Sequence, residues 1–243
     1  MAAALKLQKA PGRHRAARFL AEGPNLVEAA LRRGLVDEVF ATDDAAARFA
    51  ALLDGAPVHL VTERAAKLLS DTVTPVGLVA VCRLPSAELP PSPRLVAVAV
   101  ETSDPGNAGT VIRLADAMGA DAVVLAGNSV DPYNPKCLRA SAGSIFSLPV
   151  VEAPDTAALI SLLRGAGLSV LATTLDGEVS LDSVSLAGPT AWLFGPEAHG
   201  LSPSVASLAD ARVSIPMAGS AESLNVAAAA AICLYQSAAA HRS

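Results

Sequence analysis

A proline-rich segment, LPSAELPPSPR at residues 84–94, divides this chain into two parts. It holds four prolines and shows no apolar periodicity. Because proline lacks a backbone N–H and fixes φ, such a run neither continues a helix nor joins a central strand. With 243 residues in total, each part is long enough to bury a core. We therefore expect two α/β domains, residues 1–84 and 95–243, joined by a linker at residues 85–94.

Both parts alternate between helix-like and strand-like patterns, which is typical of α/β folds. In the first part we expect helices at 19–34 and 45–55 and strands at 36–42 and 57–62. The second part begins with RLVAVAVET at 94–102, a continuous apolar run of the kind found in strands buried on both faces of a parallel sheet. Further strands are expected at 121–127, 168–175, 190–195 and 212–217, with helices at 107–119 and 155–167 and an alanine-rich helix closing the chain.

Composition excludes several classes of protein. Hydrophobic residues make up 52%, yet no run of about 18 strongly apolar residues suggests a membrane span, and the N-terminus lacks a secretory pattern. We expect a cytoplasmic protein without membrane contact. The three cysteines, Cys82, Cys137 and Cys233, are far apart and form no C-x-x-C pair, and the four histidines are equally scattered. This pattern predicts neither a disulfide framework nor a metal site.

The charge distribution leaves two readings open. The net charge is −5, which speaks against a nonspecific nucleic-acid binder. Residues 1–33 are nevertheless basic, with seven Lys and Arg against two Glu. This stretch is either a solvated helix face or a surface for phosphate groups.

Three loops follow predicted strands, where open α/β sheets bind ligands. The first, residues 101–113, contains Asn107 and Arg113 and lacks the G-x-G-x-x-G of dinucleotide-binding turns, which argues against a Rossmann-type methyltransferase. The second, FGPEAHGLS at 194–202, holds Glu197 between two glycines. The third, within SIPMAGSAESLNVAAAAA, places small polar residues at the start of the alanine-rich helix.

Together these loops resemble the motifs of the SpoU family of RNA ribose 2'-O-methyltransferases, part of the SPOUT superfamily. The first motif, N-x-G-x-x-x-R, stands as Asn107, Gly109 and Arg113; the second as GPEAHGLS; the third as IPM followed by SLNV. All three occur in order within residues 95–236. Near the N-terminus, RFLAEGPNLVEAAL is similar to the substrate-binding domain of many such enzymes, which looks like ribosomal protein L30e.

The resemblance implies a fold with a deep trefoil knot and a site for S-adenosylmethionine, without a metal. It implies that Arg113 orients the ribose hydroxyl and stabilises the developing alkoxide, while Asn107 helps to position Arg113. Glu197 would fix the motif loops, and Ser223 and Asn225 would orient the site near the ribose. The cofactor-binding residues implied are Thr173, Gly195, Gly200, Ile215, Met217 and Leu224.

The resemblance also implies partners. RNA is the expected substrate, with 23S ribosomal RNA favoured over transfer RNA, and the predicted RNA-binding residues are Lys9, Arg13, Arg15, Arg18 and Arg139. A homodimer is expected in which Arg113 reaches the cofactor site of the neighbouring subunit. The alternatives are a transfer-RNA ribose methyltransferase, an enzyme that methylates a base nitrogen, and a catalytically silent RNA-binding protein of the same fold.

Overall fold

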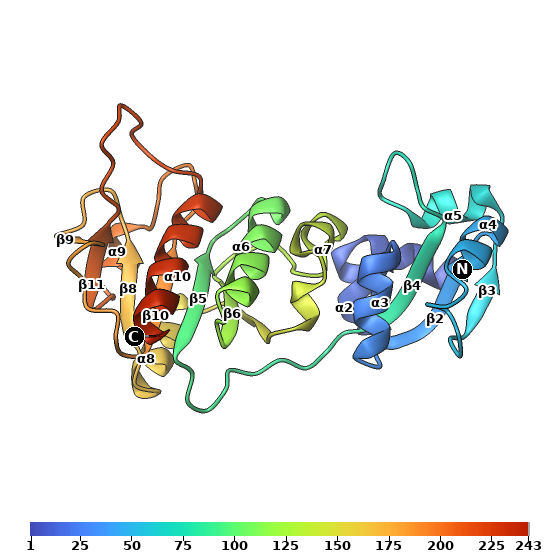
Figure 1. Cartoon of the computed structure of the whole chain (residues 1–243), viewed down its shortest axis with the longest axis horizontal. Coiled ribbons are helices and arrows are strands. Elements are labelled where there is room, and N and C mark those ends of the chain that lie inside the picture. The colour runs from blue at the N-terminus through green and yellow to red at the C-terminus, as the bar shows by residue number, and fades with distance from the viewer. Residues whose placement is uncertain (243) are drawn as a thin grey trace.

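The computed structural model describes residues 1–242 and contains two β-sheets, one in each half of an elongated molecule (Figure 1). A four-stranded sheet lies within residues 18–83, which we call with its helices the N-terminal unit. A seven-stranded sheet begins at residue 95 and forms the C-terminal unit with its helices. Residues 84–94 connect them along one side of the molecule without helix or strand.

The N-terminal unit has the strand order β1-β4-β2-β3, in which β4 is antiparallel to both neighbours and β2 pairs in parallel with β3. Its elements are α1 (Ala2–Leu5), a 3-10 turn (Lys6–Gln8), α2 (Ala10–Ala16), β1 (Arg18–Glu22), α3 (Pro24–Arg32), β2 (Val36–Ala41), α4 (Asp43–Arg48), β3 (Val58–Leu60), α5 (Glu63–Leu69) and β4 (Leu78–Arg83).

Two predictions for this unit need correction. The predicted helix at 19–34 is a strand followed by a helix, because Phe19, Leu20 and Ala21 are all buried and therefore occupy both faces of a sheet. Gly23, at φ 87°, ends the strand, and Pro24 begins α3. The predicted helix at 45–55 ends early, at Arg48. Strand β4 and helix α5 were not predicted.

The C-terminal unit has the strand order β7-β6-β5-β10-β8-β11-β9, with every pair parallel. Its elements are β5 (Leu95–Val100), α6 (Pro105–Ala117), β6 (Ala122–Ala126), α7 (Pro135–Ser141), a 3-10 turn (Ser144–Phe146), β7 (Val150–Ala153), α8 (Thr156–Gly165), β8 (Ser169–Thr173), β9 (Val179–Ser180), β10 (Thr190–Phe194), α9 (Pro203–Ala206), β11 (Ala211–Ser214) and α10 (Val226–Arg242). The predicted mixed α/β fold with a mostly parallel sheet is confirmed. The predicted strand at 212–217 ends at Ser214, so IPM belongs to a loop.

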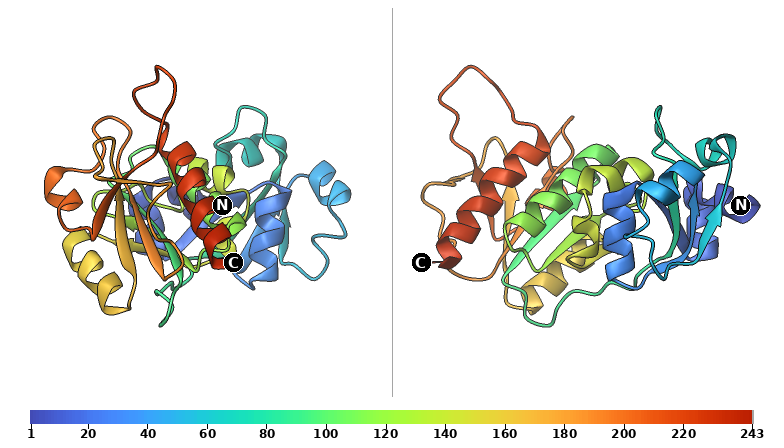
Figure 2. Two further views of the ribbon diagram at one scale, coloured as in Figure 1. Left: turned by 60° about the vertical axis from the view of Figure 1, so that its left-hand side comes forward. Right: turned by 45° about the vertical axis from the view of Figure 1, so that its right-hand side comes forward.

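Strand β5 lies at the centre of this core, and all six of its residues are buried. Alternate side chains belong to the apolar clusters on the two faces: Leu95 belongs to the cluster that includes residues of α6 and α10, whereas Val96 belongs to the cluster that includes residues of α8 and α9. Helices α6 and α10 lie side by side on one face of the sheet (Figure 2). The continuous apolar run thus marks a strand covered on both sides.

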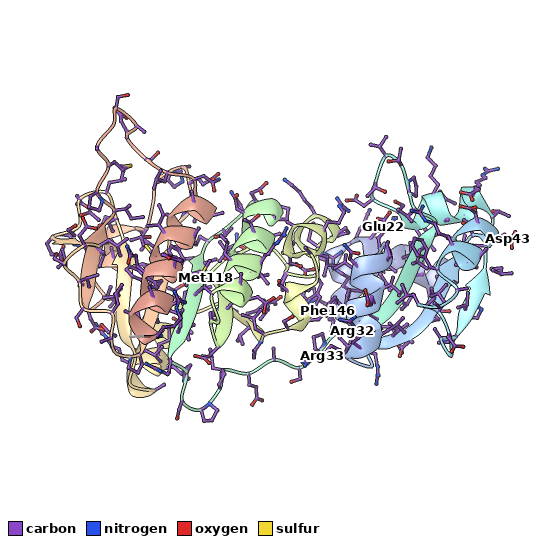
Figure 3. All side chains as sticks on the ribbon, in the orientation of Figure 1. Glu22, Arg32, Arg33, Asp43, Met118 and Phe146 are labelled. Carbon is purple, nitrogen blue, oxygen red and sulfur yellow. The ribbon has the colours of Figure 1, made fainter. Side chains whose placement is uncertain are left out.

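One apolar core continues from one unit into the other. The ring of Phe19 on β1 lies 4.8 Å from that of Tyr133 and 5.9 Å from that of Phe146, both of the C-terminal unit. Figure 3 places Phe146 at this junction. Burial of these rings packs α7 and the turn after it against β1. Over the described chain, no helix is long and apolar enough to cross a membrane.

Candidate active site

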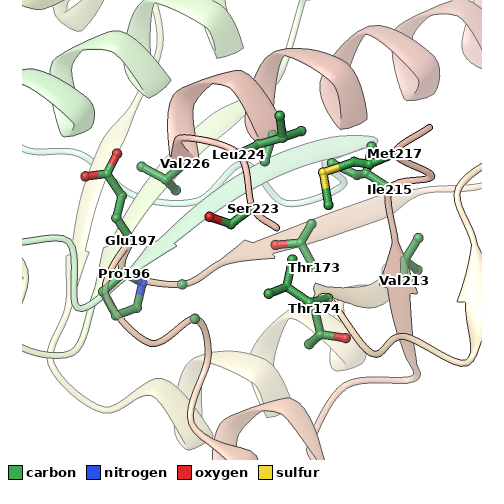
Figure 4. A pocket seen from close by; sticks show the side chains of 14 residues that line it. Thr173, Thr174, Pro196, Glu197, Val213, Ile215, Met217, Ser223, Leu224 and Val226 are labelled. Atoms are coloured by element: carbon green, nitrogen blue, oxygen red, sulfur yellow. The ribbon is translucent and has the colours of Figure 1, made fainter. Parts of the chain in front are cut away.

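A pocket lies at the carboxyl ends of β8, β10 and β11, beside the start of α10 (Figure 4). The space between its walls, solvent at its mouth included, is about 700 Å³. The residues that line it are Thr173, Thr174, Leu175, Gly195, Pro196, Glu197, Gly200, Val213, Ile215, Met217, Ser223, Leu224, Val226 and Ala229. Aliphatic side chains and glycine backbone dominate this lining, with few charged groups.

Asn225 joins the three loops at the mouth of the pocket. Its side-chain oxygen accepts hydrogen bonds from the backbone N–H of Ala227 at 2.9 Å and of Ala228 at 3.4 Å, and so caps α10. Its amide nitrogen donates to Glu197 Oε1 and lies 3.3 Å from Asn107 Oδ1. One side chain therefore satisfies the helix end and connects the first two motif loops to the third.

Gly195 allows the second loop to fold back on itself. A Cβ at this position would lie 2.3 Å from the backbone nitrogen of Leu201 and 2.5 Å from the carbonyl carbon of Gly200. Gly200 adopts φ 66°, in the left-handed region, and its N–H donates to Pro196 O at 2.9 Å. The tight loop brings backbone groups to the pocket wall and holds Glu197 beside Asn225.

The first loop is fixed at the start of α6. Asp104 caps this helix by accepting the Asn107 N–H at 2.9 Å, and its other oxygen pairs with Lys136 Nζ at 2.7 Å. The Lys136 hydrogen bond, followed by the Asn107 N–H, lowers the pKa of Asp104. Gly109 permits α6 to pack on α7, since a Cβ there would lie 2.3 Å from Cys137 O. Asn107 is consequently held facing Asn225.

The structure brings most predicted site residues together. All six predicted cofactor-binding residues line the pocket, as do Glu197 and Ser223. Thr173 serves a structural bond as well, because its hydroxyl donates to Leu193 O at 3.0 Å. Six lining residues were not predicted, and each is a close chain neighbour of a predicted one or of a motif: Thr174, Leu175, Pro196, Val213, Val226 and Ala229.

Arg113 is the predicted catalytic residue that lies outside the pocket. It is exposed on α6, six positions after Asn107, and does not line the pocket. Within residues 1–242 its side chain forms no ion pair or hydrogen bond. Asn107 contacts Asn225 rather than Arg113, so the positioning role expected for Asn107 is not seen within one chain.

The predicted RNA-binding residues fall into three groups. Arg13 is 3% exposed and paired with Asp131, so this prediction is wrong: the side chain is not available to RNA. Arg18 and Arg139 form ion pairs with Asp37 and Asp71, respectively. Lys9 and Arg15 are exposed, and neither side chain has an ion-pair partner among the described residues.

Within residues 1–242, no group of three His, Cys, Asp or Glu residues is placed to hold a metal ion.

Comparison with known proteins identifies the chain. Residues 94–235 match the model of the SpoU rRNA Methylase family, and residues 2–80 match an MRM3-like substrate binding domain. The chain belongs to the SpoU family. The predicted family and the predicted substrate-binding domain are thereby confirmed.

Among SpoU relatives, the 23S rRNA (guanosine(2553)-2'-O)-methyltransferase RlmP of Bacillus subtilis is 36% identical over 89% of this chain and 87% of its own. A 23S rRNA (uridine(2479)-2'-O)-methyltransferase of Streptomyces viridochromogenes is 42% identical over 55% of this chain and 48% of its own. The crystal structure of the SpoU methyltransferase AviRb from the same organism, in complex with AdoMet, superposes with a TM-score of 0.88 at 31% identity, covering 99% of this chain and 97% of that one. The superposition with AviRb therefore spans both the pocket-bearing sheet and the N-terminal unit.

Proposed function

We propose that this protein transfers a methyl group from S-adenosylmethionine to a ribose 2'-hydroxyl of RNA, most specifically of 23S ribosomal RNA. The observation that carries the proposal is the contact of Asn225 with Asn107 and Glu197 at the mouth of the pocket. Those residues come from the three SpoU motifs, and the relatives named above are 23S rRNA 2'-O-methyltransferases. An enzyme of ribosomal RNA acts where ribosomes are assembled, so we propose the cytoplasm as its location.

The pocket fits S-adenosylmethionine. Backbone of Gly195 and Gly200 is accessible because neither glycine carries a Cβ, and apolar side chains of Ile215, Met217 and Leu224 offer a surface for a flat adenine ring. When bound there, the cofactor supplies an electrophilic methyl group. A related SpoU structure was solved with this cofactor, which supports the same assignment here.

The polar residues at the mouth hold the geometry of the reaction. Asn225, fixed by Glu197 and Asn107, keeps loop 215–225 against the first motif loop. Ser223 lines the pocket and has no hydrogen-bond partner within residues 1–242, so its hydroxyl is free to orient the ribose. Holding donor and acceptor in line accounts for much of the acceleration in such reactions.

Arg113 supplies positive charge from a second subunit. Arginine stays protonated at neutral pH and is a poor base, so we assign it to orienting the 2'-hydroxyl and stabilising the alkoxide that develops. Its absence from the residues that line the pocket of its own chain favours a homodimer with shared sites. The exposed apolar side chains of Ile232 and Tyr235 on α10, the helix that packs beside α6, offer a surface for the second copy.

The route of the chain supports a trefoil knot. Strand β11 lies beyond β8, whereas α10 packs on β5, β10 and α6. Residues 215–225 must therefore cross back over the carboxyl ends of β8 and β10, beside the loop at 195–201, which is the crossing that a knot requires. A protease site inserted in loop 215–225 and cleaved in the folded protein should remove any slow, threading-limited refolding phase; an unchanged phase would argue against the knot.

We propose that residues 1–84 form a domain that binds the RNA substrate. Residues 85–94 link this domain to the catalytic domain at 95–243. Relatives named tRNA/rRNA methyltransferases, such as slr1673 of Synechocystis at 32% identity, keep transfer RNA as the alternative substrate. A silent RNA-binding protein is disfavoured, because its site would not need to keep the Asn225 contacts.

Incubation with labelled S-adenosylmethionine tests the function. Ribosomal RNA from cells lacking this protein should accept label, and transfer RNA should not. A target whose nucleotide carries a 2'-deoxyribose should accept none. Continued labelling of the deoxy substrate would show that the enzyme methylates a base nitrogen. Labelling of transfer RNA alone would establish transfer RNA as the substrate.

A further inference from the structure

A buried ion pair joins the two units. Arg13 on α2 donates from Nε to Asp131 Oδ2 at 2.7 Å, and its Nη2 lies 2.5 Å from the same oxygen. Asp131 lies in the C-terminal unit, between β6 and α7. The Arg13 side chain is 3% exposed and that of Asp131 12% exposed. The Arg13 guanidinium is therefore buried and the Asp131 carboxylate is mostly covered where the two units meet.

Further bonds fix each partner on its own side. Arg13 Nη1 donates to the carbonyl oxygens of Leu7 and Gln8, both at 3.0 Å. Asp131 Oδ1 accepts the Tyr133 N–H at 2.8 Å. The rigid guanidinium fork is thus engaged by both units at once, and a rotation of one unit against the other breaks at least one of these bonds.

The other contacts between the units are less directional. The stacking of Phe19 on Tyr133 and Phe146 resists separation but tolerates sliding, because apolar attraction has no preferred direction. The second ion pair, between Arg139 and Asp71, is exposed. A buried pair contributes little net stability, because lost hydration offsets the attraction, but it does select one geometry.

We infer that Arg13 is a positioning residue: with Asp131 it fixes the N-terminal unit relative to the pocket and thereby sets which ribose of a bound RNA is methylated. The inference rests on the proposed RNA methylation. RNA held by the N-terminal unit presents to the pocket only the nucleotide that this fixed geometry allows. A displacement of about 1 Å between reacting groups lowers rates on the order of 100-fold.

The variant Arg13→Met with Asp131→Asn tests this inference. The double substitution removes both charges, so neither charge is left buried without its partner. The Asn side chain at position 131 keeps an oxygen that can accept the Tyr133 N–H. The matched control is Arg164→Met with Asp210→Asn, which neutralises an exposed pair within the C-terminal unit. Both variants lose the same charges, so a general effect of charge on RNA binding would appear in both.

The first measurement is the distance between spin labels at Asp54→Cys and Asp182→Cys, one in each unit and both exposed. The three natural cysteines are buried and so escape labelling. Labelled chains are diluted with unlabelled ones so that only distances within one chain are read. The distance distribution should broaden about twofold or more in the Arg13 variant and stay unchanged in the control.

The second measurement maps methylated riboses and determines kcat and KM. The Arg13 variant should lose about tenfold or more in kcat at the wild-type nucleotide and gain label at neighbouring riboses, with KM for RNA and cofactor affinity within about twofold of wild type.

Unchanged methylation at the same nucleotide together with an unchanged distance distribution would overturn the inference. If wild-type protein methylates no RNA, the proposed function fails, but the distances still decide whether the pair fixes the units. Should the double variant not fold, Arg13→Lys keeps the charge, cannot make all the contacts of the fork, and gives the same readouts.

Discussion

The side-chain amide nitrogen of Asn225 lies 3.3 Å from the side-chain oxygen of Asn107, although 118 positions separate the two residues. The same nitrogen donates to Glu197, and the side-chain oxygen of Asn225 caps α10. A single amide thereby fixes the relative positions of a strand-to-helix turn, a glycine loop and a helix start. We expect the reactivity of the pocket to depend on this arrangement more than on any other polar contact around it.

Replacement of Asn225 should separate capping from loop connection. Asn225→Ala removes both and should lower the free energy of unfolding by about 1 kcal/mol. Asn225→Ser keeps a capping oxygen and should recover most of that stability, yet remain as inactive as the alanine variant because Glu197 and Asn107 lose their partner. Urea unfolding and methyl transfer measure the two effects. An active serine variant would show that capping is the whole role of Asn225.

Gly195→Ala should weaken cofactor binding by about tenfold or more, or about 1.4 kcal/mol. The added Cβ would meet backbone atoms of Gly200 and Leu201 at 2.3–2.5 Å, so the loop must open. Gly188→Ala is the control, since a Cβ there has no atom within 4 Å. Titration calorimetry with S-adenosylmethionine compares the three proteins. Equal affinities would exclude the loop at 195–201 from the cofactor site.

Arg113→Ala should abolish methyl transfer while leaving cofactor affinity unchanged and stability within about 0.5 kcal/mol, because the side chain is exposed. Mixing it with inactive Asn225→Ala chains should restore part of the activity, because one site of each mixed dimer then carries neither change. Mixed dimers that form yet stay inactive would place both residues in a site built by one chain.

The exposed residues Lys9 and Arg15 are the remaining candidates in the basic N-terminal stretch. Lys9→Ala with Arg15→Ala should weaken RNA binding and reduce the slope of log affinity against log salt by roughly two, if each contacts one phosphate. Filter binding between 50 and 200 mM salt, roughly the range in which such losses are large, measures this slope. The same slope as wild type would assign the stretch to a solvated surface.

The buried thiols should destabilise the fold in alkali. Burial is the main cause that raises the pKa of Cys82, Cys137 and Cys233 from 9.0 to about 12. Because the unfolded chain loses these protons first, their contribution is complete below pH 9 and falls as pH rises toward 12, by up to about 1.4 kcal/mol per pH unit for each thiol. The stability difference between wild type and Cys233→Ala, from urea unfolding, should therefore shrink above pH 9. A constant difference would contradict a raised pKa.

Much of the C-terminal unit could be predicted because its signals are local. The run at 95–100 is apolar at every position, and only a strand covered on both faces buries it entirely. The motif loops follow their strands directly, so a parallel sheet brings them to one edge whatever the order of the strands. For that reason, pocket residues such as Gly195 and Leu224 could be predicted from the sequence.

The N-terminal unit was predicted less well because short segments there have ambiguous patterns. The sequence FLA at 19–21 suits a helix as well as a strand, and only pairing with β4, which lies some sixty positions later, selects the strand. The sequence around a basic residue likewise does not indicate which acidic residue it pairs with. Arg13 and Arg15 look alike in sequence, yet one is buried against Asp131 and the other is exposed.

By itself, then, the sequence determined the fold class, the family and the edge of the sheet that holds the pocket, because apolar periodicity, glycines and motif spacing act over a few residues. Only the tertiary structure decided which residues meet across more than one hundred positions. In the structure, Asn225 contacts Asn107, and Arg113 does not line the pocket of its own chain. Arg13, which was predicted to bind RNA at the surface, is buried and contacts Asp131 of the other unit. The physical reason is that long-range pairing is set by the packing of whole elements, in which burial and hydrogen-bond geometry select one partner among many that are chemically equivalent.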